Sequence, residues 1–268
     1  SNNVNSSMVT FTIDTTFPTF TWTDPTPADK SSTSANSTYL NATITDATQT
    51  SAWFDWNKSL VGYWAMDFRN STGVYDNSTK GNFGTATGGA VFNSSGFYGG
   101  AYTFDGVNDK ISLGTAIAMP EPLTISAWIK KNSLTGEQSI VVDSNSGTTT
   151  YWEFATNAQA VRFGWASALS NYRIYDTADV ISSTNNWYHV AVTQTGTNAP
   201  TIYVNGLSVT SSLVLTSGVN TRPSSAQGTS IGFFATNYPA YFNGSIDEVT
   251  IFNRALSSTE ILALYNNS

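Results

Sequence analysis

Residues 242–264 read Phe-Asn-Gly-Ser-Ile-Asp-Glu-Val-Thr-Ile-Phe-Asn-Arg-Ala-Leu-Ser-Ser-Thr-Glu-Ile-Leu-Ala-Leu. Their first part, 242–252, predicts a long β-strand. Ser257 and Glu260 then form a capping box that satisfies first-turn amides, so one short helix is expected after the strand. Further candidate strands, separated by Gly and Asn turns, are 60–67, 101–104, 110–113, 123–130, 138–143, 151–156, 160–166, 187–194, 200–204 and 229–234. This regular spacing is typical of an all-β sandwich or jelly roll.

Charged side chains make up only 11% of the 268 residues, and the formal net charge is −7. Because there is no basic stripe, neutralisation of phosphates cannot drive binding, and nucleic acid is not an expected partner. No apolar stretch approaches the roughly 20 residues that span a bilayer, so no membrane span is expected. The chain has no cysteine, so the redox compartment cannot be inferred from thiols.

Acceptor sequences for N-linked glycans are dense in this chain. The pattern Asn-x-Ser/Thr occurs at Asn5, Asn36, Asn41, Asn57, Asn70, Asn77, Asn93, Asn243 and Asn266. A chain rich in Asn, Ser and Thr also forms such patterns by chance. A cysteine-free, acidic, sequon-rich chain nevertheless favours an extracellular, cell-surface protein, and we expect several of these sites to carry glycans.

The first 59 residues contain short strands separated by prolines. Val9, Phe11 and Ile13 alternate with threonines, which predicts a half-buried strand over 8–14. Pro18 and the Pro-containing stretch 24–27 then interrupt the pattern. Alternation resumes over 37–45, and 51–56 is a third candidate strand. Short strands and turns of this kind suggest a small immunoglobulin-like or fibronectin-like sandwich.

Six segments of the chain resemble, in order, the laminin-G-like, concanavalin A-like jelly-roll family. They are Leu60-Val-Gly-Tyr-Trp64, Gly99-Gly-Ala-Tyr-Thr-Phe-Asp-Gly-Val-Asn-Asp-Lys110, Leu123-Thr-Ile-Ser-Ala-Trp-Ile129, Asn186-Trp-Tyr-His-Val-Ala-Val192, Ile202-Tyr-Val-Asn-Gly206 and Gly244-Ser-Ile-Asp-Glu-Val-Thr-Ile-Phe-Asn-Arg-Ala-Leu-Ser257. The residues before them resemble the immunoglobulin-like repeats of archaeal and bacterial surface proteins. The expected organisation is an orphan strand in 1–17, an incomplete immunoglobulin-like domain in 18–59 and a laminin-G-like jelly roll in 60–268.

No catalytic residues are expected. The glucanases that resemble this fold carry two carboxylates on one strand face, in a Glu-x-Asp-x-Glu or Glu-x-Asp-x-x-Glu pattern. Neither pattern occurs, and the glutamates are scattered at Glu121, Glu137, Glu153, Glu248 and Glu260. Adjacent Asp247 and Glu248 would point to opposite faces of a strand. His189, the only histidine, lies in an ordinary strand pattern, which favours a structural role.

Calcium is the one cofactor that the resemblance implies, since some family members bind it at the rim of the jelly roll. Asp67, Asp76 and Asp247 are the candidate ligands, because Ca²⁺ prefers several oxygen donors from loops. For Asp76 and Asn82 the alternative is a turn in which the side chains bond to nearby backbone amides.

Saccharide binding would use exposed aromatic faces flanked by polar groups. The candidates are Trp152, Trp165, Tyr172, Tyr238 and Tyr241. An aromatic side chain in a β-protein is nevertheless more often part of the core than of a binding site.

The first functional hypothesis is a non-catalytic structural or adhesive module of a surface protein, array or filament. The second is a calcium-assisted carbohydrate-binding lectin module. The strand with Val9, Phe11 and Ile13 precedes a domain that lacks a closing strand, so head-to-tail strand addition between copies is a third expectation. A fragment cut from a longer protein would show the same pattern. The expected partners are therefore other copies of the unit or neighbouring surface domains, and glycans.

Overall fold

The computed structural model describes residues 19–23, 41–45, 59–114, 117, 120–144, 150–168, 171–218, 220–223, 228–234 and 239–267. The chain divides into two compact units, residues 1–54 and 55–268. This boundary lies a few residues before the one expected from the sequence. Each unit is considered by itself.

In the first unit, the described residues form one antiparallel pair, β1 (Thr19–Thr23) and β2 (Asn41–Thr45). β2 lies within the alternating stretch 37–45, whereas β1 was not expected from the sequence. The candidate strands 8–14 and 51–56 lie outside the described residues. The immunoglobulin-like assignment of this unit therefore stays a prediction.

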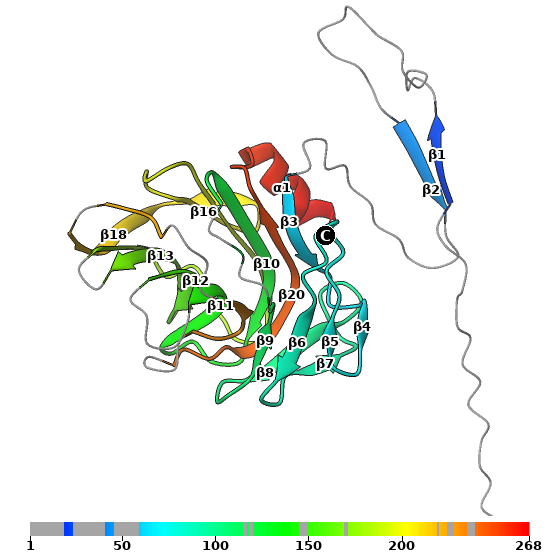
Figure 1. Cartoon of the computed structure of the whole chain (residues 1–268), viewed down its shortest axis with the longest axis horizontal. Helices are drawn as coiled ribbons and strands as arrows, with labels where there is room; N and C mark the ends of the chain where they lie inside the picture. The colour runs from blue at the N-terminus through cyan, green and yellow to red at the C-terminus, as the bar shows by residue number, and fades with distance from the viewer. Residues whose placement is uncertain are drawn as a thin grey trace, which may run out of the picture. The chain divides into compact units, whose positions relative to one another are not determined.

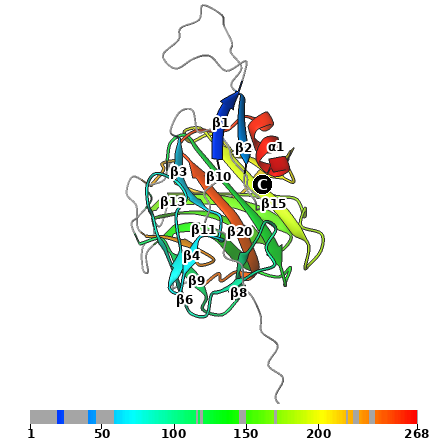
Figure 2. The ribbon, with the colours of Figure 1, turned by 90° about the vertical axis from the view of Figure 1, so that its right-hand side faces the viewer.

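The second unit is a sandwich of two antiparallel sheets, which confirms the expected all-β jelly-roll class (Figures 1 and 2). In the first sheet β20 (Asn243–Phe252) lies between β10 (Leu123–Lys131) and β8 (Ala101–Asp105). A further strand, β3 (Leu60–Trp64), also pairs with β20. The order of this eight-stranded sheet is β17 (Leu207–Val209), β16 (Thr201–Val204), β15 (Trp187–Gln194), β10 (Leu123–Lys131), β20 (Asn243–Phe252), β8 (Ala101–Asp105) and β7 (Val91–Asn93), with β3 (Leu60–Trp64) beside β20.

The second sheet has ten strands. Their order is β18 (Ser211–Ser217), β14 (Asn171–Thr177), β13 (Ala160–Ala168), β12 (Tyr151–Asn157), β11 (Glu137–Ser144), β19 (Thr229–Ile231), β9 (Lys110–Ser112), β6 (Gly84–Thr87), β5 (Gly73–Val74) and β4 (Arg69–Asn70). Strands next to each other in this order are hydrogen-bonded, and they include pairs far apart in the sequence, such as β11 with β19.

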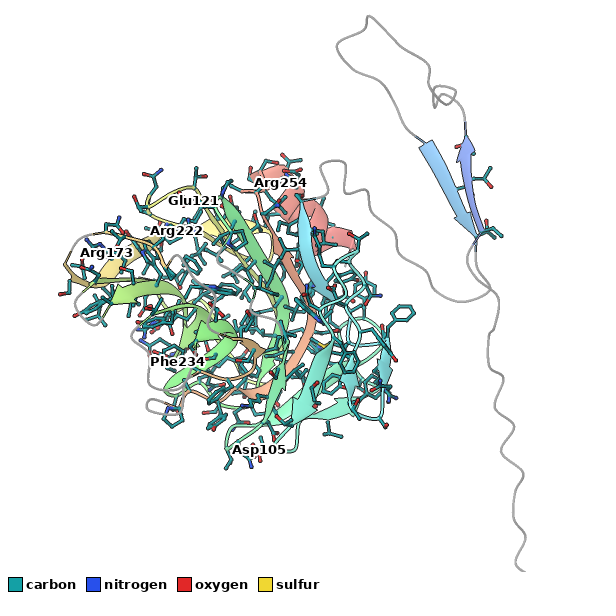
Figure 3. All side chains as sticks on the ribbon, in the orientation of Figure 1. Asp105, Glu121, Arg173, Arg222, Phe234 and Arg254 are labelled. Carbon is teal, nitrogen blue, oxygen red and sulfur yellow. The ribbon has the colours of Figure 1, made fainter. Side chains whose placement is uncertain are left out.

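The core lies between the sheets, where their side chains fill the space (Figure 3). Ile125 and Val190 come from the eight-stranded sheet, and Phe154, Phe163 and Trp165 come from the ten-stranded sheet. All five are fully buried. Successive residues of a strand point to opposite faces, so the residues between these apolar ones lie on the outer faces. Glu153 and Arg162, which each lie between two buried apolar residues of their strands, therefore belong to the outer face of the ten-stranded sheet.

The chain after β20 forms the expected helix, α1 (Ser258–Asn267). Its capping box is present, because the Ser257 N–H donates to Glu260 at 2.8 Å and the Glu260 N–H donates to the Ser257 hydroxyl at 3.3 Å. The Arg254 guanidinium bonds to Glu260 and lowers the pKa of that carboxyl to about 2. No helix among the described residues is long and apolar enough to cross a bilayer.

Candidate functional site

Two carboxylates from distant parts of the chain hold one surface turn, residues 96–100. Asp247 on β20 accepts the Phe97 and Tyr98 N–H groups on Oδ2 at 2.9 and 3.1 Å. Asp67 accepts the Gly100 N–H on Oδ1 at 2.7 Å. The structure thus brings two of the three expected metal ligands to the same place, which we call the 96–100 turn.

Gly99 allows the Asp67 carboxylate to lie against the backbone of the 96–100 turn. Its φ of 49° lies in the left-handed region, and a Cβ at this position would lie 2.4 Å from Asp67 Oδ1. Any larger residue would push the carboxylate away from the turn.

Glu248 joins the same group through an irregularity in β20. The pairing of β10 with β20 shifts register here, and Glu248 has a φ of 50°, so the strict alternation that separates Asp247 from Glu248 in a regular strand does not hold. The Glu248 carboxylate accepts the Tyr63 hydroxyl at 2.7 Å. Regular alternation along a strand predicts that Asp247 and Glu248 point to opposite faces. The irregularity in β20 removes this separation.

These carboxylates differ in solvation, since Asp247 is buried, Glu248 is half-buried and Asp67 is exposed. Burial, followed by the charge of Glu248, raises the pKa of Asp247 to about 8. Burial and the charge of Asp67 raise the pKa of Glu248 to about 7, although the bond from Tyr63 opposes this. Burial also raises the pKa of Asp67. Groups whose negative charge is penalised in this way gain from a bound cation or from donated hydroxyl protons.

The turn offers only part of a calcium shell. Ca²⁺ takes six to eight oxygen ligands, and no three acidic or histidine side chains among the described residues are grouped as a metal centre. Both oxygens of Asp247 already accept backbone N–H groups. Asp67 and Glu248 each keep one oxygen without a hydrogen bond to another described residue. A cation here would need these two oxygens together with backbone and water oxygens.

Asp76, the third expected ligand, shapes its own loop instead. Its Oδ1 accepts the N–H groups of Tyr63 and Ser78 at 2.9 and 2.8 Å. Its Oδ2 accepts the backbone and side-chain N–H groups of Asn82 at 2.9 and 3.1 Å. The protein's own donors occupy both oxygens, which corresponds to the turn alternative rather than to a ligand.

Of the aromatic residues expected to bind sugars, none that the structure describes is exposed. Trp152 and Trp165 are 0% exposed, because both lie on the inner face of the ten-stranded sheet, and they are corrected here to core residues. Tyr172 is half-buried on β14, and Tyr241 is half-buried with its ring 4.9 Å from that of Phe233. Tyr238 lies outside the described residues.

Exposed rings occur elsewhere. Phe97, on the 96–100 turn, is 37% exposed and stacks on Trp128 with 3.4 Å between ring centroids. Phe68 and Tyr75 are 62% and 48% exposed beside the β4–β5 hairpin. The sequence signal that would have found this pair is the turn-rich stretch between two aromatic residues, Phe68-Arg-Asn-Ser-Thr-Gly-Val-Tyr75.

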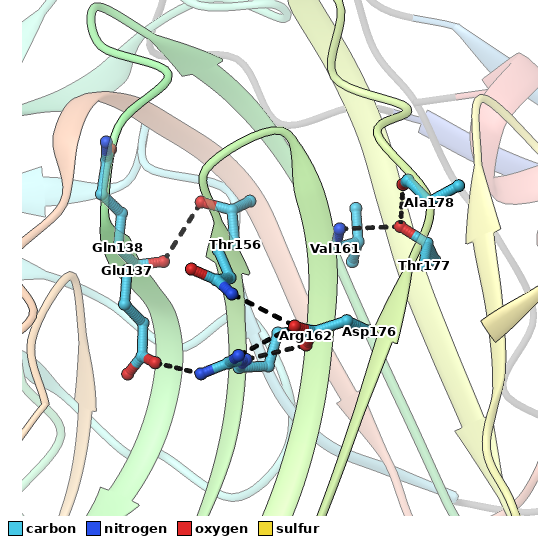
Figure 4. A network of polar contacts seen from close by, with 9 residues as sticks. Glu137, Gln138, Thr156, Val161, Arg162, Asp176, Thr177 and Ala178 are labelled. Carbon is cyan, nitrogen blue, oxygen red and sulfur yellow. Dashed lines mark hydrogen bonds and ion pairs between the residues drawn. The ribbon is translucent and has the colours of Figure 1, made fainter. Parts of the chain in front are cut away.

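A second acidic group lies on the outer face of the ten-stranded sheet, and Figure 4 shows Glu137 and Asp176 of this group beside Arg162. Glu137, Glu153 and Asp176 come from β11, β12 and β14, and the strand register places them around Arg162 of β13. The guanidinium binds Asp176 through two hydrogen bonds of 2.8 Å and also pairs with Glu137. Sequence reasoning missed this group because it depends on register between strands.

The outer-face group is a closed network. Glu153 is buried and hydrogen-bonded to Glu137, and burial together with the charge of Glu137 holds its pKa well above the ordinary value. Glycosidases keep their two carboxyl groups roughly 5–9.5 Å apart, with the sugar between them. Glu137 and Asp176 are both bound by Arg162, so their charges are already paired within the protein and this group lacks that arrangement.

His189 is 1% exposed and its Nε2 is 2.8 Å from the Ser126 hydroxyl. Burial lowers its pKa to about 4. A neutral imidazole packed within a sheet is consistent with the structural role expected from the sequence.

The sequon asparagines are widely distributed. Asn70, Asn77 and Asn266 are exposed, and Asn93 and Asn243 are half-buried. Asn41 begins β2, and Asn5, Asn36 and Asn57 lie outside the described residues. The strand residues Val9, Phe11 and Ile13 also lie outside them.

Comparisons with solved structures agree on the fold. Domain 4 of AbnA, a GH43 extracellular arabinanase from Geobacillus stearothermophilus solved with arabinotriose, matches 77% of this chain and 98% of its own length, with a TM-score of 0.60 and 19% identity. The binding domain of botulinum neurotoxin serotype D/C matches 78% of this chain with a TM-score of 0.59 and 17% identity. This match covers 52% of the binding-domain chain, so the present chain spans about half the length of that domain.

No curated protein matches the sequence significantly. A family model described as the concanavalin A-like lectin/glucanases superfamily (Laminin_G_3) matches residues 104–262, which run from β8 into α1. This match covers more than half of the chain, and the sandwich described above has the corresponding architecture. The chain therefore belongs to the concanavalin A-like lectin/glucanases superfamily.

Proposed function

We propose that this chain is a non-catalytic saccharide-binding module that serves adhesion at a cell surface, with its site at the 96–100 turn. The observation that carries the proposal is that Asp67 and Asp247 hold the turn bearing the exposed Phe97 ring, with Glu248 next to Asp247 in the chain. Saccharides combine apolar C–H faces with hydroxyl donors. A ring flanked by carboxylate acceptors matches both properties.

Each part of the turn has a role in this proposal. Phe97 would pack against the sugar face, and its stacking on Trp128 fixes the ring in advance. The free oxygens of Asp67 and Glu248 would accept sugar hydroxyls. Because Glu248 is half-buried, a new donor to it replaces few bonds to water.

Similar proteins give this proposal further support. The arabinanase domain was solved in complex with arabinotriose. Another match, a botulinum neurotoxin type C structure with a TM-score of 0.57 and 17% identity, is described through the interaction of that toxin with two ganglioside molecules. Both ligands contain saccharides. The absence of a separated carboxylate pair in the outer-face group supports a binding role over hydrolysis.

A glycan array followed by calorimetry tests the proposal. The wild type should bind at least one saccharide, and Phe97→Ala and Asp67→Asn should each weaken that binding at least tenfold. Val107→Ala is the matched control, since Val107 is an apolar residue that is 67% exposed in a different turn. Failure of the wild type to bind any glycan, or equal affinity in all four proteins, would contradict the proposal.

Calcium assistance is a second proposal for the same turn. The two free carboxylate oxygens and their raised pKa values favour a cation, and a cation would also coordinate sugar hydroxyls. In that case Asp67 and Glu248 would hold the ion, and saccharide affinity would depend on it.

Self-association by strand addition is a third proposal, supported by the first unit. Within its described residues β1 pairs only with β2, and an isolated two-stranded sheet is marginal in water. The apolar alternation of Val9, Phe11 and Ile13 suits a strand donated to the β1–β2 sheet of another copy. Such head-to-tail contacts would build a filament or array.

A further inference from the structure

The β4–β5 hairpin exposes two aromatic rings on one face. Arg69 pairs with Val74, and the Tyr75 N–H donates to the Phe68 carbonyl at 2.7 Å, so Phe68 lies opposite Tyr75. Opposite residues of an antiparallel pair point to the same face. Val74 and Arg69 point to the other face of the hairpin. Val74 is buried there, and the Arg69 guanidinium carbon lies 3.6 Å from the centroid of the Phe92 ring. The exposed rings of Phe68 and Tyr75 therefore lie on the same face of the hairpin, and we call them the aromatic patch.

Asn70 lies on the same face, two residues after Phe68. Its side-chain Nδ2 donates to the Tyr75 hydroxyl at 3.2 Å. Its Oδ1 accepts the Thr72 hydroxyl at 2.8 Å and the Thr72 and Gly73 N–H groups at 2.8 and 3.1 Å. Asn70-Ser71-Thr72 is a complete glycosylation sequon whose amide is held beside the aromatic pair.

We infer that Asn70 carries an N-linked glycan whose first sugar packs against Phe68 and Tyr75. Oδ1 is turned toward the backbone of the turn, which leaves one hydrogen of Nδ2 toward Tyr75 and the other for substitution. Modification forms a bond between Nδ2 and C1 of the sugar. It breaks the bond between C1 and the phosphate oxygen of a lipid-linked glycosyl phosphate, and the released Nδ2 proton leaves with that phosphate.

The packing explains why two large rings remain exposed here. The apolar face of a hexopyranose covers aromatic carbon that water solvates poorly. Tyr75 is already fixed, because its ring meets Phe83 edge-on with 5.1 Å between centroids. The first sugar would therefore bind a preformed surface and stiffen the hairpin. This site is separate from the 96–100 turn, so it does not depend on the proposed saccharide-binding function.

Two measurements test the inference. Glycopeptide mass spectrometry of the protein purified from its own cells should show a glycan at Asn70, and a bare Asn70 peptide would overturn the inference. The second measurement uses protein secreted from a glycosylating host and trimmed enzymatically to one sugar. All variants carry Asn77→Gln, because Asn77 follows Tyr75 by two residues and its glycan would also reach that ring.

The trimmed protein should melt about 2–4 °C higher than the same sequence made in a host that does not glycosylate, because both keep the rings and the bond from the Thr72 hydroxyl to Asn70 and differ only in the sugar. Phe68→Ala keeps the sequon, and its glycosylated and unglycosylated forms should melt at the same temperature. Ser95→Ala removes the Asn93 sequon, which has Val91 in place of Phe68, and should leave the melting temperature unchanged.

Two further outcomes count against the inference. A stabilisation that persists in Phe68→Ala would show that the sugar does not use the rings. Saturable binding of free N-acetylglucosamine to Thr72→Ala, lost in Phe68→Ala, would show that the patch serves a diffusing saccharide instead.

Discussion

Replacing Glu153 by glutamine should stabilise the protein increasingly as the pH rises. The unfolded chain releases the Glu153 proton near pH 4.5, whereas burial and the charge of Glu137 hold the pKa in the folded state well above that value. Between these two values the folded protein binds more protons than the unfolded chain. Stability from this group is therefore fully present below pH 4.5 and is lost as the pH rises toward the folded pKa. Glutamine keeps an N–H donor for Glu137 and does not titrate.

The magnitude follows from proton linkage. One proton contributes at most about 1.4 kcal/mol per pH unit, so wild type should lose up to that much stability relative to Glu153→Gln for each pH unit between 4.5 and the folded pKa. For a domain of about 200 residues this corresponds to a melting-temperature difference of roughly 2–4 °C per pH unit. Acids that do not interact with Glu153, such as Asp247 and Glu248, affect both proteins equally and cancel in the comparison.

Urea denaturation of both proteins at four pH values across this range measures the effect. Glu121→Gln is the control, because it removes the same charge from a side chain that is 57% exposed beside Arg222 (Figure 3). A difference between Glu153→Gln and wild type that stays constant with pH would refute the reasoning, since Glu153 would then be ionised throughout.

Three further predictions concern other parts of the molecule. Arg162→Met should cost about 3–5 kcal/mol in urea denaturation at pH 7, because Glu137 and Asp176 lose their shared counter-charge; a loss below about 1 kcal/mol would contradict this. If calcium binds at the 96–100 turn, EDTA should lower the melting temperature of wild type but not of Asp67→Asn, and an unchanged wild-type transition would argue against the metal. Deleting residues 1–14 should abolish any concentration-dependent polymers seen by light scattering while leaving the jelly roll folded, and polymers that persist would exclude the strand-donor role.

The fold was largely predictable because most of its strands carry strong local patterns. The stretch 242–252 became β20, and the capping box at Ser257 began α1. β14 was missed because its outer-face residues are polar, and Arg173 and Asp176 break the apolar pattern of the strand. β18 was missed because Leu213, Val214 and Leu215 lie at a sheet edge with a register shift, where neither face is fully buried.

The candidate site was only partly predictable. Asp67 and Asp247 were identified through resemblance, but the contribution of Glu248 depends on a strand irregularity that no local pattern reveals. Trp152 and Trp165 were misassigned because a sequence does not state which face of a strand meets the other sheet. Arg162 meets Asp176 through pairing of β13 with β14, and such register is set by the whole sheet.

The position of β20 has a consequence for how the chain acquires its structure. This strand is the last of the jelly roll, yet it pairs with β10, β8 and the first strand, β3. During synthesis β10, β8 and β3 cannot pair with β20 until residues 243–252 have left the ribosome. Until then these three strands have unpaired backbone edges. Pairing between such distant segments slows folding and prolongs exposure to aggregation. A released chain that ends before residue 243 should therefore fail to form the sandwich and should aggregate, because the central strand of its eight-stranded sheet is missing.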